Sequence, residues 1–120
     1  MEIPKVFESE YRFCLILWEN EGLSAAALAA LCKERLGWSR TTTYTVIKRL
    51  GERGVLRNED GQVRSLYSKE EIQQREIDEL VEKTFEGSLP AFVAAFTKHK
   101  KLTRDQAEEI RRMIDEYTED

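Results

Sequence analysis

The chain of 120 residues has few of the side chains on which catalysis and metal binding most often depend. Its one histidine, His99, lies in a run of lysines, which indicates a solvated helix end rather than a ligand or a catalytic base. Its two cysteines, Cys14 and Cys32, form no C-x-x-C pair and are interpreted as small buried hydrophobic side chains. With no Ser-His-Asp set, glycine-rich phosphate loop or metal-ligand spacing, we expect no enzyme, no cofactor and no metal site.

Long hydrophobic runs and targeting signals are also missing. The apolar patch at residues 13–18 is far shorter than a membrane span. The N-terminus lacks the basic-then-apolar pattern of a signal peptide, so we expect a cytoplasmic location and no membrane partner. Hydrophobic residues make up 41% of the sequence, which is enough for one or two small cores and argues against wholesale disorder.

The net charge of −4 hides a local positive excess. Residues 69–120 carry nine Lys/Arg and 14 Asp/Glu, whereas residues 33–57 carry seven cations and only two acids. A local excess of this kind is what a DNA-binding surface requires, whatever the charge of the whole chain. An ordinary solvated helix face is the alternative explanation.

Capping residues and apolar spacing predict three helices in the first part of the chain. Ser9, Ser24 and Ser39 are expected to be their N-caps. Glycines end the second and third helices, at Gly37 and Gly54. Residues 38–39 form the short hinge between these two helices.

A β-hairpin is expected to follow the third helix. The first strand begins at residues 55–57, residues 58–61 form a turn with the hairpin signal Asp-Gly, and residues 63–68 form the returning strand. Leu23 is expected to contribute a strand of one or two residues at most. This order predicts a mainly α fold with a winged helix-turn-helix domain at residues 1–68, in which the hairpin is the wing.

The third helix separates into two faces when successive residues are rotated by about 100°. We expect one face to be buried, and it contains Thr43, Val46, Ile47, Leu50 and Gly54. The other face carries hydroxyls and cations, which contact phosphates and base edges in DNA complexes. Glu52 also faces outward, far enough along the helix to clear the DNA. With the helix start and two wing arginines, the predicted DNA-binding residues are Ser39, Arg40, Thr41, Thr42, Tyr44, Thr45, Lys48, Arg49, Arg57 and Arg64.

Residues 69–120 are predicted to form a helical dimerisation domain. Capping boxes at Ser68/Glu71 and Thr103/Gln106 and an N-cap at Ser88 indicate three helices. Short amphipathic helices bury their stripes poorly alone, so a second copy of the chain is the expected partner. Packing onto the winged domain of the same chain is the alternative. The predicted dimerisation residues are Ile77, Leu80, Val81, Phe85, Leu89, Phe92, Val93, Phe96, Ile110, Met113, Ile114 and Tyr117. The members of this set in the last helix, together with Ala107, are expected to face inward.

Four segments carry a resemblance to a known family: S-E-Y-R-F-C-L-I-L-W, L-G-W-S-R-T-T-T-Y-T-V-I-K-R-L-G-E-R-G-V-L, L-Y-S-K-E-E and F-E-G-S-L-P-A-F-V-A-A-F. Together they resemble the penicillinase-repressor family of the BlaI/MecI type, which has the copper-responsive CopY repressors as relatives. The resemblance implies a homodimeric transcriptional repressor. Its winged helix would bind a palindromic operator in double-stranded DNA, and its C-terminal helices would interlock with those of the partner.

The resemblance also concerns the release of the repressor. In the β-lactam branch a membrane sensor-protease signals, and the repressor is cut at an Asn-Phe bond. That bond aligns with Ala95–Phe96, where alanine replaces the asparagine. The resemblance to this branch implies a sensor protease as a possible partner. The cysteine-rich tail of the copper branch is missing, and the releasing signal stays open.

A winged helix that binds only other proteins is the alternative function. Such a module would present an apolar or acidic third helix and no basic wing, and this sequence shows the opposite. A small effector at the dimer interface, next to Phe85, Phe92 and Phe96, is a further variant, although core packing is the more common use of such a cluster.

Overall fold

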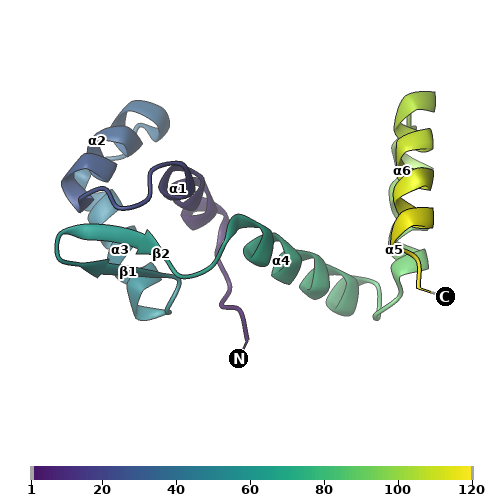
Figure 1. The fold of residues 1–120 in the computed structure, drawn as a ribbon, viewed down its shortest axis with the longest axis horizontal. Helices are drawn as coiled ribbons and strands as arrows, with labels where there is room; N and C mark the ends of the chain where they lie inside the picture. The colour runs from purple at the N-terminus through teal and green to yellow at the C-terminus, as the bar shows by residue number, and fades with distance from the viewer. Residues whose placement is uncertain (1, 120) are drawn as a thin grey trace. The chain divides into compact units, whose positions relative to one another are not determined.

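The computed structural model describes residues 2–119 and is mainly helical (Figure 1). The elements are α1 (Glu8–Glu19), α2 (Ala25–Leu36), α3 (Arg40–Glu52), β1 (Leu56–Glu59), β2 (Gln62–Ser65), α4 (Lys69–Thr84), α5 (Leu89–His99) and α6 (Arg104–Tyr117). Three helices, a two-stranded hairpin and three further helices confirm the predicted fold class. None of the helices in the described part has the length and apolar character needed to cross a membrane.

The chain divides into two compact units, and the division falls within α4. The N-terminal unit ends at Asp78 and the C-terminal unit begins at Glu79. The domain boundary predicted between residues 68 and 69 stays a prediction.

The helix-turn-helix is fixed by local hydrogen bonds that the sequence predicts correctly. The hydroxyl of Ser24 accepts the N–H of Ala27 (3.1 Å) and caps α2, and the hydroxyl of Ser39 accepts the N–H of Thr42 (3.1 Å) and caps α3. Gly37 ends α2 with a φ of 71°, in the left-handed region that favours glycine. These caps leave only three residues between the two helices.

The prediction that Ser9 caps the first helix is wrong. The helix begins at Glu8, and Phe7 is its N-cap residue. The backbone N–H of Phe7 donates to Oε1 of Glu10 (2.9 Å), so a carboxylate from the first turn binds back to the N-cap residue and no serine hydroxyl caps the helix. Arg53 of a distant segment binds the same carboxylate, which explains why local sequence did not indicate this start.

The hairpin is tighter than predicted. β1 begins at Leu56 rather than at residue 55, and the turn consists of Asp60 and Gly61 alone. Both turn residues have positive φ, 52° and 74°, as two-residue turns of type I′ require. In the antiparallel register Leu56 lies opposite Ser65 and Glu59 opposite Gln62.

β2 ends at Ser65, whereas the sequence predicted a strand to residue 68. One further hydrogen bond joins the two segments, from the N–H of Leu66 to the carbonyl of Val55 (2.8 Å), and the groups after it have other partners. The carbonyl of Tyr67 accepts the indole N–H of Trp18 (3.0 Å), and Ser68 forms a capping box with Glu71 at the start of α4, as predicted.

No separate strand forms at Leu23, but the segment still pairs with the wing. The N–H of Gly22 donates to the carbonyl of Val63 (2.9 Å), and the N–H of Val63 donates to the carbonyl of Leu23 (2.8 Å). The connection between α1 and α2 therefore holds β2 on its free edge.

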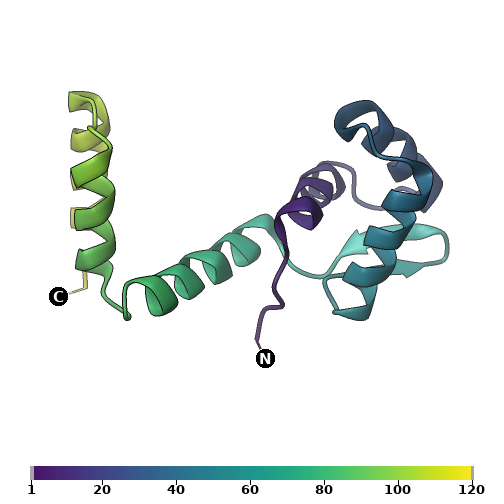
Figure 2. The same ribbon diagram turned by 180° about the vertical axis from the view of Figure 1, so that it is seen from behind.

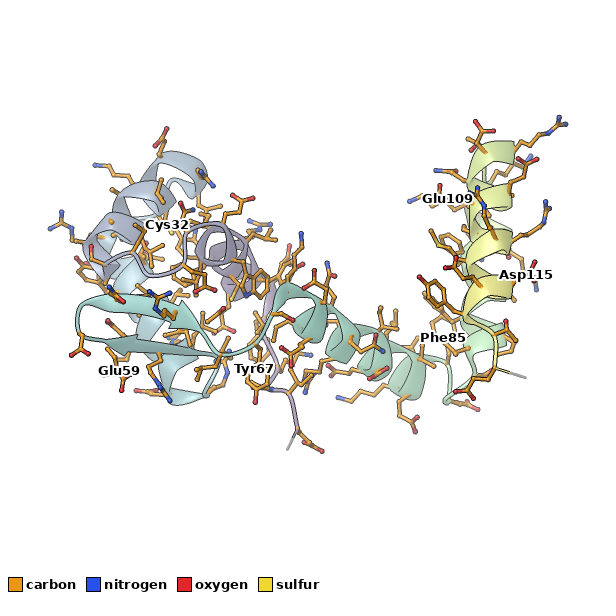
Figure 3. The ribbon with its side chains drawn as sticks, in the orientation of Figure 1. Cys32, Glu59, Tyr67, Phe85, Glu109 and Asp115 are labelled. Atoms are coloured by element: carbon orange, nitrogen blue, oxygen red, sulfur yellow. The ribbon has the colours of Figure 1, made fainter. Side chains whose placement is uncertain are left out.

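The core of the N-terminal unit takes apolar side chains from each of its elements. Its largest fully buried hydrophobic residues are Phe13, Leu17, Leu28, Leu50, Val55, Val63 and Ile72. Cys14 and Cys32 are buried thiols in this core, as predicted, and Figure 3 labels Cys32. Burial raises the pKa of Cys14 to about 12 and also raises that of Cys32, so both thiols stay protonated and unreactive at neutral pH.

The C-terminal unit contains the end of α4 together with α5 and α6. α5 and α6 run in opposite directions (Figure 1 and Figure 2). Ser88 and Thr103 cap them, as predicted. Among residues 79–119, Val81 is the only one that the structure buries. The residues of α6 expected to face inward are not buried by the single chain: Met113, Ile114 and Tyr117 are exposed.

Candidate nucleic-acid interface

α3 has one face in the core and one in solvent, as the helical periodicity predicted. Thr43, Val46, Ile47 and Leu50 are buried against the other elements of the N-terminal unit. Gly54, which was expected on the same face, lies beyond the end of the helix and is half-buried. The predicted reading residues of this helix are exposed without exception: Arg40, Thr41, Thr42, Tyr44, Thr45, Lys48 and Arg49. The buried residues thus fix the helix, and the opposite face can contact a second molecule.

The exposed face of α3 carries three cations that form no ion pair among the described residues, although Glu52 is exposed one turn beyond Lys48. Among the residues described, no carboxylate oxygen lies within 4.0 Å of the cationic groups of Arg40, Lys48 or Arg49. Tyr44 is 39% exposed, although aromatic residues of this size are usually more buried. Hydroxyls, an aromatic ring and free cations on one helix are suited to phosphates and base edges.

The start of α3 adds hydrogen-bond donors. The hydroxyls of Ser39 and Thr42 lie 2.9 Å apart, and the first of them accepts the N–H of the second residue. The N–H groups of Arg40 and Thr41 are in the first turn, where no helical partner exists. Together with the helix dipole, these groups favour an anion such as phosphate.

Open space lies on both sides of the exposed face of α3. On the side of the wing, Tyr44, Lys48 and Leu66 help to line a hollow of about 760 Å³. On the other side, Trp38 and Thr45 help to line a smaller hollow of about 310 Å³. α3 therefore stands as a ridge between two hollows, a form that can enter a groove of a double helix.

The wing brings its two predicted cations together. Arg57 lies directly opposite Arg64 in the register of the hairpin, so both side chains project from the same face. Like charges at opposite positions repel each other. Arg57 is partly compensated by Glu59 (3.5 Å) and Arg64 by a hydrogen bond to Gln62 (3.1 Å).

The contacts that hold the wing were not predicted. The carboxylate of Glu21 accepts the backbone N–H of Ser65 (2.8 Å) and also its hydroxyl. Gly22 provides room for Arg64, since a Cβ atom at this glycine would lie 2.8 Å from the guanidinium. The connection between α1 and α2 thus sets both the edge of the wing and the place of one of its arginines.

A second unpredicted group of contacts lies at the C-terminal end of α3. Arg53, the residue after the helix, binds the buried carboxylate of Glu10, donates to the carbonyl of Lys5 (3.2 Å) and lies 5.4 Å from the ring centre of Phe7. Burial raises the pKa of Glu10, but the hydrogen bonds from Arg53 and Phe7 and the positive charges nearby outweigh burial and lower the pKa overall. The N-terminal segment is thereby tied to α3.

Most of the predicted dimerisation residues are exposed in the single chain. Phe85, Phe92 and Ile110 are half-buried, and Val81 is buried. The rings of Phe85 and Phe92 meet edge to face at 5.5 Å between centres. The remaining residues are exposed: Ile77, Leu80, Leu89, Val93, Phe96, Met113, Ile114 and Tyr117.

The bond that aligns with the family's cleavage site lies within a helix. Ala95 and Phe96 lie within α5, so a protease would need local unwinding of this helix to reach the bond between them. Among residues 2–119 no three His, Cys, Asp or Glu side chains are grouped in a way that could hold a metal ion.

The fold and the interface define a winged helix-turn-helix protein with an additional helical C-terminal unit. The sequence matches the penicillinase repressor family over residues 7–116, and the chain belongs to this family of transcriptional regulators. The methicillin resistance regulatory protein MecI of Staphylococcus aureus (strain Mu50) is 25% identical over 114 residues, which cover 92% of this chain and 93% of the relative. The MecI proteins of Mammaliicoccus sciuri and Staphylococcus epidermidis are each 24% identical with the same coverage.

Proposed function

We propose that the chain is a homodimeric transcriptional repressor that binds a palindromic operator through α3 and the wing. The observation that carries the proposal is the exposed face of α3, with its hydroxyls and unpaired cations between two hollows. Membership in the penicillinase repressor family supports it. Phosphate contacts supply affinity and its salt dependence, and base contacts from α3 supply specificity.

Dimerisation is part of the proposal because the C-terminal unit leaves much of its apolar surface exposed. Exposed apolar patches of this kind mark interaction sites in soluble proteins. Two copies present two copies of α3, and two linked half-sites multiply a modest affinity for one half-site. The match to MecI proteins over nearly their whole length supports a common arrangement.

The proposal is tested by changing three exposed side chains of α3 together, Thr41→Ala, Thr45→Ala and Lys48→Ala. The DNA is a duplex selected from random sequences with the unchanged protein, and binding is followed by fluorescence anisotropy. We expect affinity to fall at least about a hundredfold, since each good contact with a base contributes about 1–3 kcal/mol. The unfolding midpoint should change little because the three residues are exposed.

Lys69→Ala is the matched control, since it removes one exposed lysine outside α3 and the wing. It should leave affinity within about threefold of the unchanged protein. If the triple variant keeps full affinity while it remains folded and dimeric, α3 is not the reading helix. If the unchanged protein binds no duplex even at low salt, the chain is a protein-interaction module instead.

A further inference from the structure

Gly22, in the connection between α1 and α2, lies against the guanidinium of Arg64 in the wing. A Cβ atom at this glycine would lie 2.8 Å from Nη2, 3.1 Å from Cζ and 3.3 Å from Nη1 of Arg64. Non-bonded carbon atoms are normally about 3.5–4.0 Å from their neighbours. The planar end of the arginine therefore occupies space that a side chain at position 22 would need.

The backbone around Gly22 is held to β2 and cannot easily withdraw from the arginine. The N–H of Gly22 donates to the carbonyl of Val63 (2.9 Å), and the N–H of Val63 donates to the carbonyl of Leu23 (2.8 Å). The carboxylate of Glu21 accepts the backbone N–H of Ser65 (2.8 Å). A side chain at position 22 would thus displace the arginine, whose long side chain has many rotamers, rather than the connection itself.

The guanidinium of Arg64 keeps its charge in this position. Among the described residues, no carboxylate oxygen lies within 4.0 Å of it. Its Nη2 donates to the neutral amide oxygen of Gln62 (3.1 Å), and this bond uses only one of its N–H donors. The carboxylate of Glu21 binds the N–H and the hydroxyl of Ser65 instead. The cation is therefore suited to a phosphate of a second molecule.

The contacts with Gly22 and Gln62 restrict an arginine that is otherwise exposed. An unrestricted arginine side chain loses much rotamer freedom when it binds a ligand, and this loss opposes binding. A side chain that is already restricted in the free protein loses less. The place of Arg64, opposite Arg57 in the hairpin, is thus set before DNA arrives.

We propose that Gly22 is a positioning residue for DNA binding, because the absence of a side chain leaves the place in which Arg64 is held. The connection between α1 and α2 then influences DNA binding through this arginine, without touching the DNA itself. The proposal rests on the function proposed above, in which the wing arginines contact the DNA backbone.

The direct test is Gly22→Ala, with fluorescence anisotropy on the duplex selected by the unchanged protein. The added methyl group should displace Arg64 and lower affinity about fivefold at about 100 mM salt. The slope of log affinity against log salt should fall by about 1, as for the loss of one phosphate contact. A merely structural role of Gly22 would leave this slope unchanged.

Gly54→Ala is the matched control for backbone strain. Gly22 has a φ of 86° and Gly54 a φ of 78°, so alanine is strained at either position. A Cβ atom at Gly54 would have no described residue within 4 Å apart from its chain neighbours. Both variants should lower the midpoint of urea unfolding to a similar degree, but Gly54→Ala should keep its affinity for DNA. An equal loss of affinity in both would assign the effect to strain and overturn the proposal.

Arg64→Gln shows whether Gly22 acts through the arginine. Alone it should lower affinity and slope as much as Gly22→Ala does. The two changes in one chain should bind within about twofold of either single variant, since both remove the same contact. If the two losses instead multiply, Gly22 affects DNA binding by another route and the proposal is wrong.

Each remaining outcome contradicts a different statement. Unchanged affinity in Gly22→Ala means that Arg64 binds equally well without this place. Higher affinity means that the glycine holds the arginine away from the DNA. Unchanged affinity and slope in Arg64→Gln mean that this arginine does not bind the backbone. If the unchanged protein binds no duplex at all, the DNA binding proposed above fails, which is distinct from a wrong role of Gly22.

Discussion

The N-terminal and C-terminal units use their apolar residues differently. The first buries a continuous cluster contributed by α1, α2, α3, the hairpin and the start of α4. In the second, among residues 79–119, Val81 alone is buried, while side chains as large as Phe96 and Tyr117 are exposed. One unit thus has a core of its own, and the other leaves apolar side chains exposed that the proposed dimer would cover.

The polar contacts differ between the two units in the same way. In the N-terminal unit they join distant segments, such as the indole of Trp18 with the carbonyl of Tyr67 and Arg53 with Glu10. In the C-terminal unit, contacts such as Lys83 with Glu79 and the capping box of Thr103 join residues three or four apart. Local contacts define helices but do not position them against each other.

The largest expected effect comes from the core of the N-terminal unit. Phe13→Ala removes a fully buried ring and should lower the free energy of unfolding by about 3–5 kcal/mol. Urea unfolding followed by tryptophan fluorescence measures this change, since Trp18 packs against that core. Phe96→Ala removes the same ring from the C-terminal unit, where it is 39% exposed, and should leave this transition nearly unchanged. Equal losses in both variants would contradict the contrast between the units.

The next effect concerns the exposed apolar surface of the C-terminal unit. Ile114→Asp places a charge among these side chains and should weaken the dimer at least about a hundredfold, because a buried unpaired charge is costly. Sedimentation equilibrium gives the dissociation constant. Arg112→Asp introduces the same carboxylate on the polar side of α6 and should have a much smaller effect. A dimer that withstands Ile114→Asp would remove this surface from the interface.

A smaller effect is expected at the wing. Arg57→Gln with Arg64→Gln removes two cations that lie opposite each other and should lower affinity for operator DNA about thirtyfold. The slope of log affinity against log salt should fall by about 2, as for the loss of two phosphate contacts. Anisotropy titrations at several salt concentrations measure both. An unchanged slope would show that the wing does not contact the backbone.

The smallest effect is expected at the contact between Glu10 and Arg53. Glu10→Gln keeps the shape of the side chain but removes its charge, and should lower stability by about 1 kcal/mol at pH 7. The pKa of Glu10 is lowered in the folded protein. The stabilisation that the ionised carboxylate provides is therefore complete above the pKa of the unfolded chain, about 4.3, and is lost as pH falls through the lower pKa of the folded protein. Urea unfolding at pH 7 and at successively lower pH should show the loss largest at pH 7 and shrinking as pH falls. Glu8→Gln, exposed on the same helix, is the control.

The sequence predicted those parts of the fold whose cause is local. Ser24, Ser39 and Thr103 cap helices by bonds to residues three positions away, and Asp60 with Gly61 closes a hairpin that needs two positive φ angles. The faces of α3 followed from helical periodicity alone. Local signals therefore sufficed for most elements and for the exposed residues of the candidate interface.

The errors arose where distant residues decide the structure. The first helix begins after Phe7 because the carboxylate of Glu10 accepts the backbone N–H of Phe7. Arg53, which lies 43 residues after Glu10 in the sequence, binds the same carboxylate. The contacts that hold the wing involve the carboxylate of Glu21 and the space next to Gly22. Both residues come close to β2 only after folding. Neither pairing leaves a periodic pattern or a turn signal in the sequence.

In the proposed function, two copies of α3 in one dimer read the DNA. The most direct measurement is repeated selection of duplexes from a random-sequence pool by the full-length protein, followed by sequencing. We expect enrichment of two inverted half-sites at a fixed spacing, since a two-fold symmetric dimer requires a palindromic site. Folded, dimeric protein that enriches no sequence, or only an unpaired half-site, would contradict it.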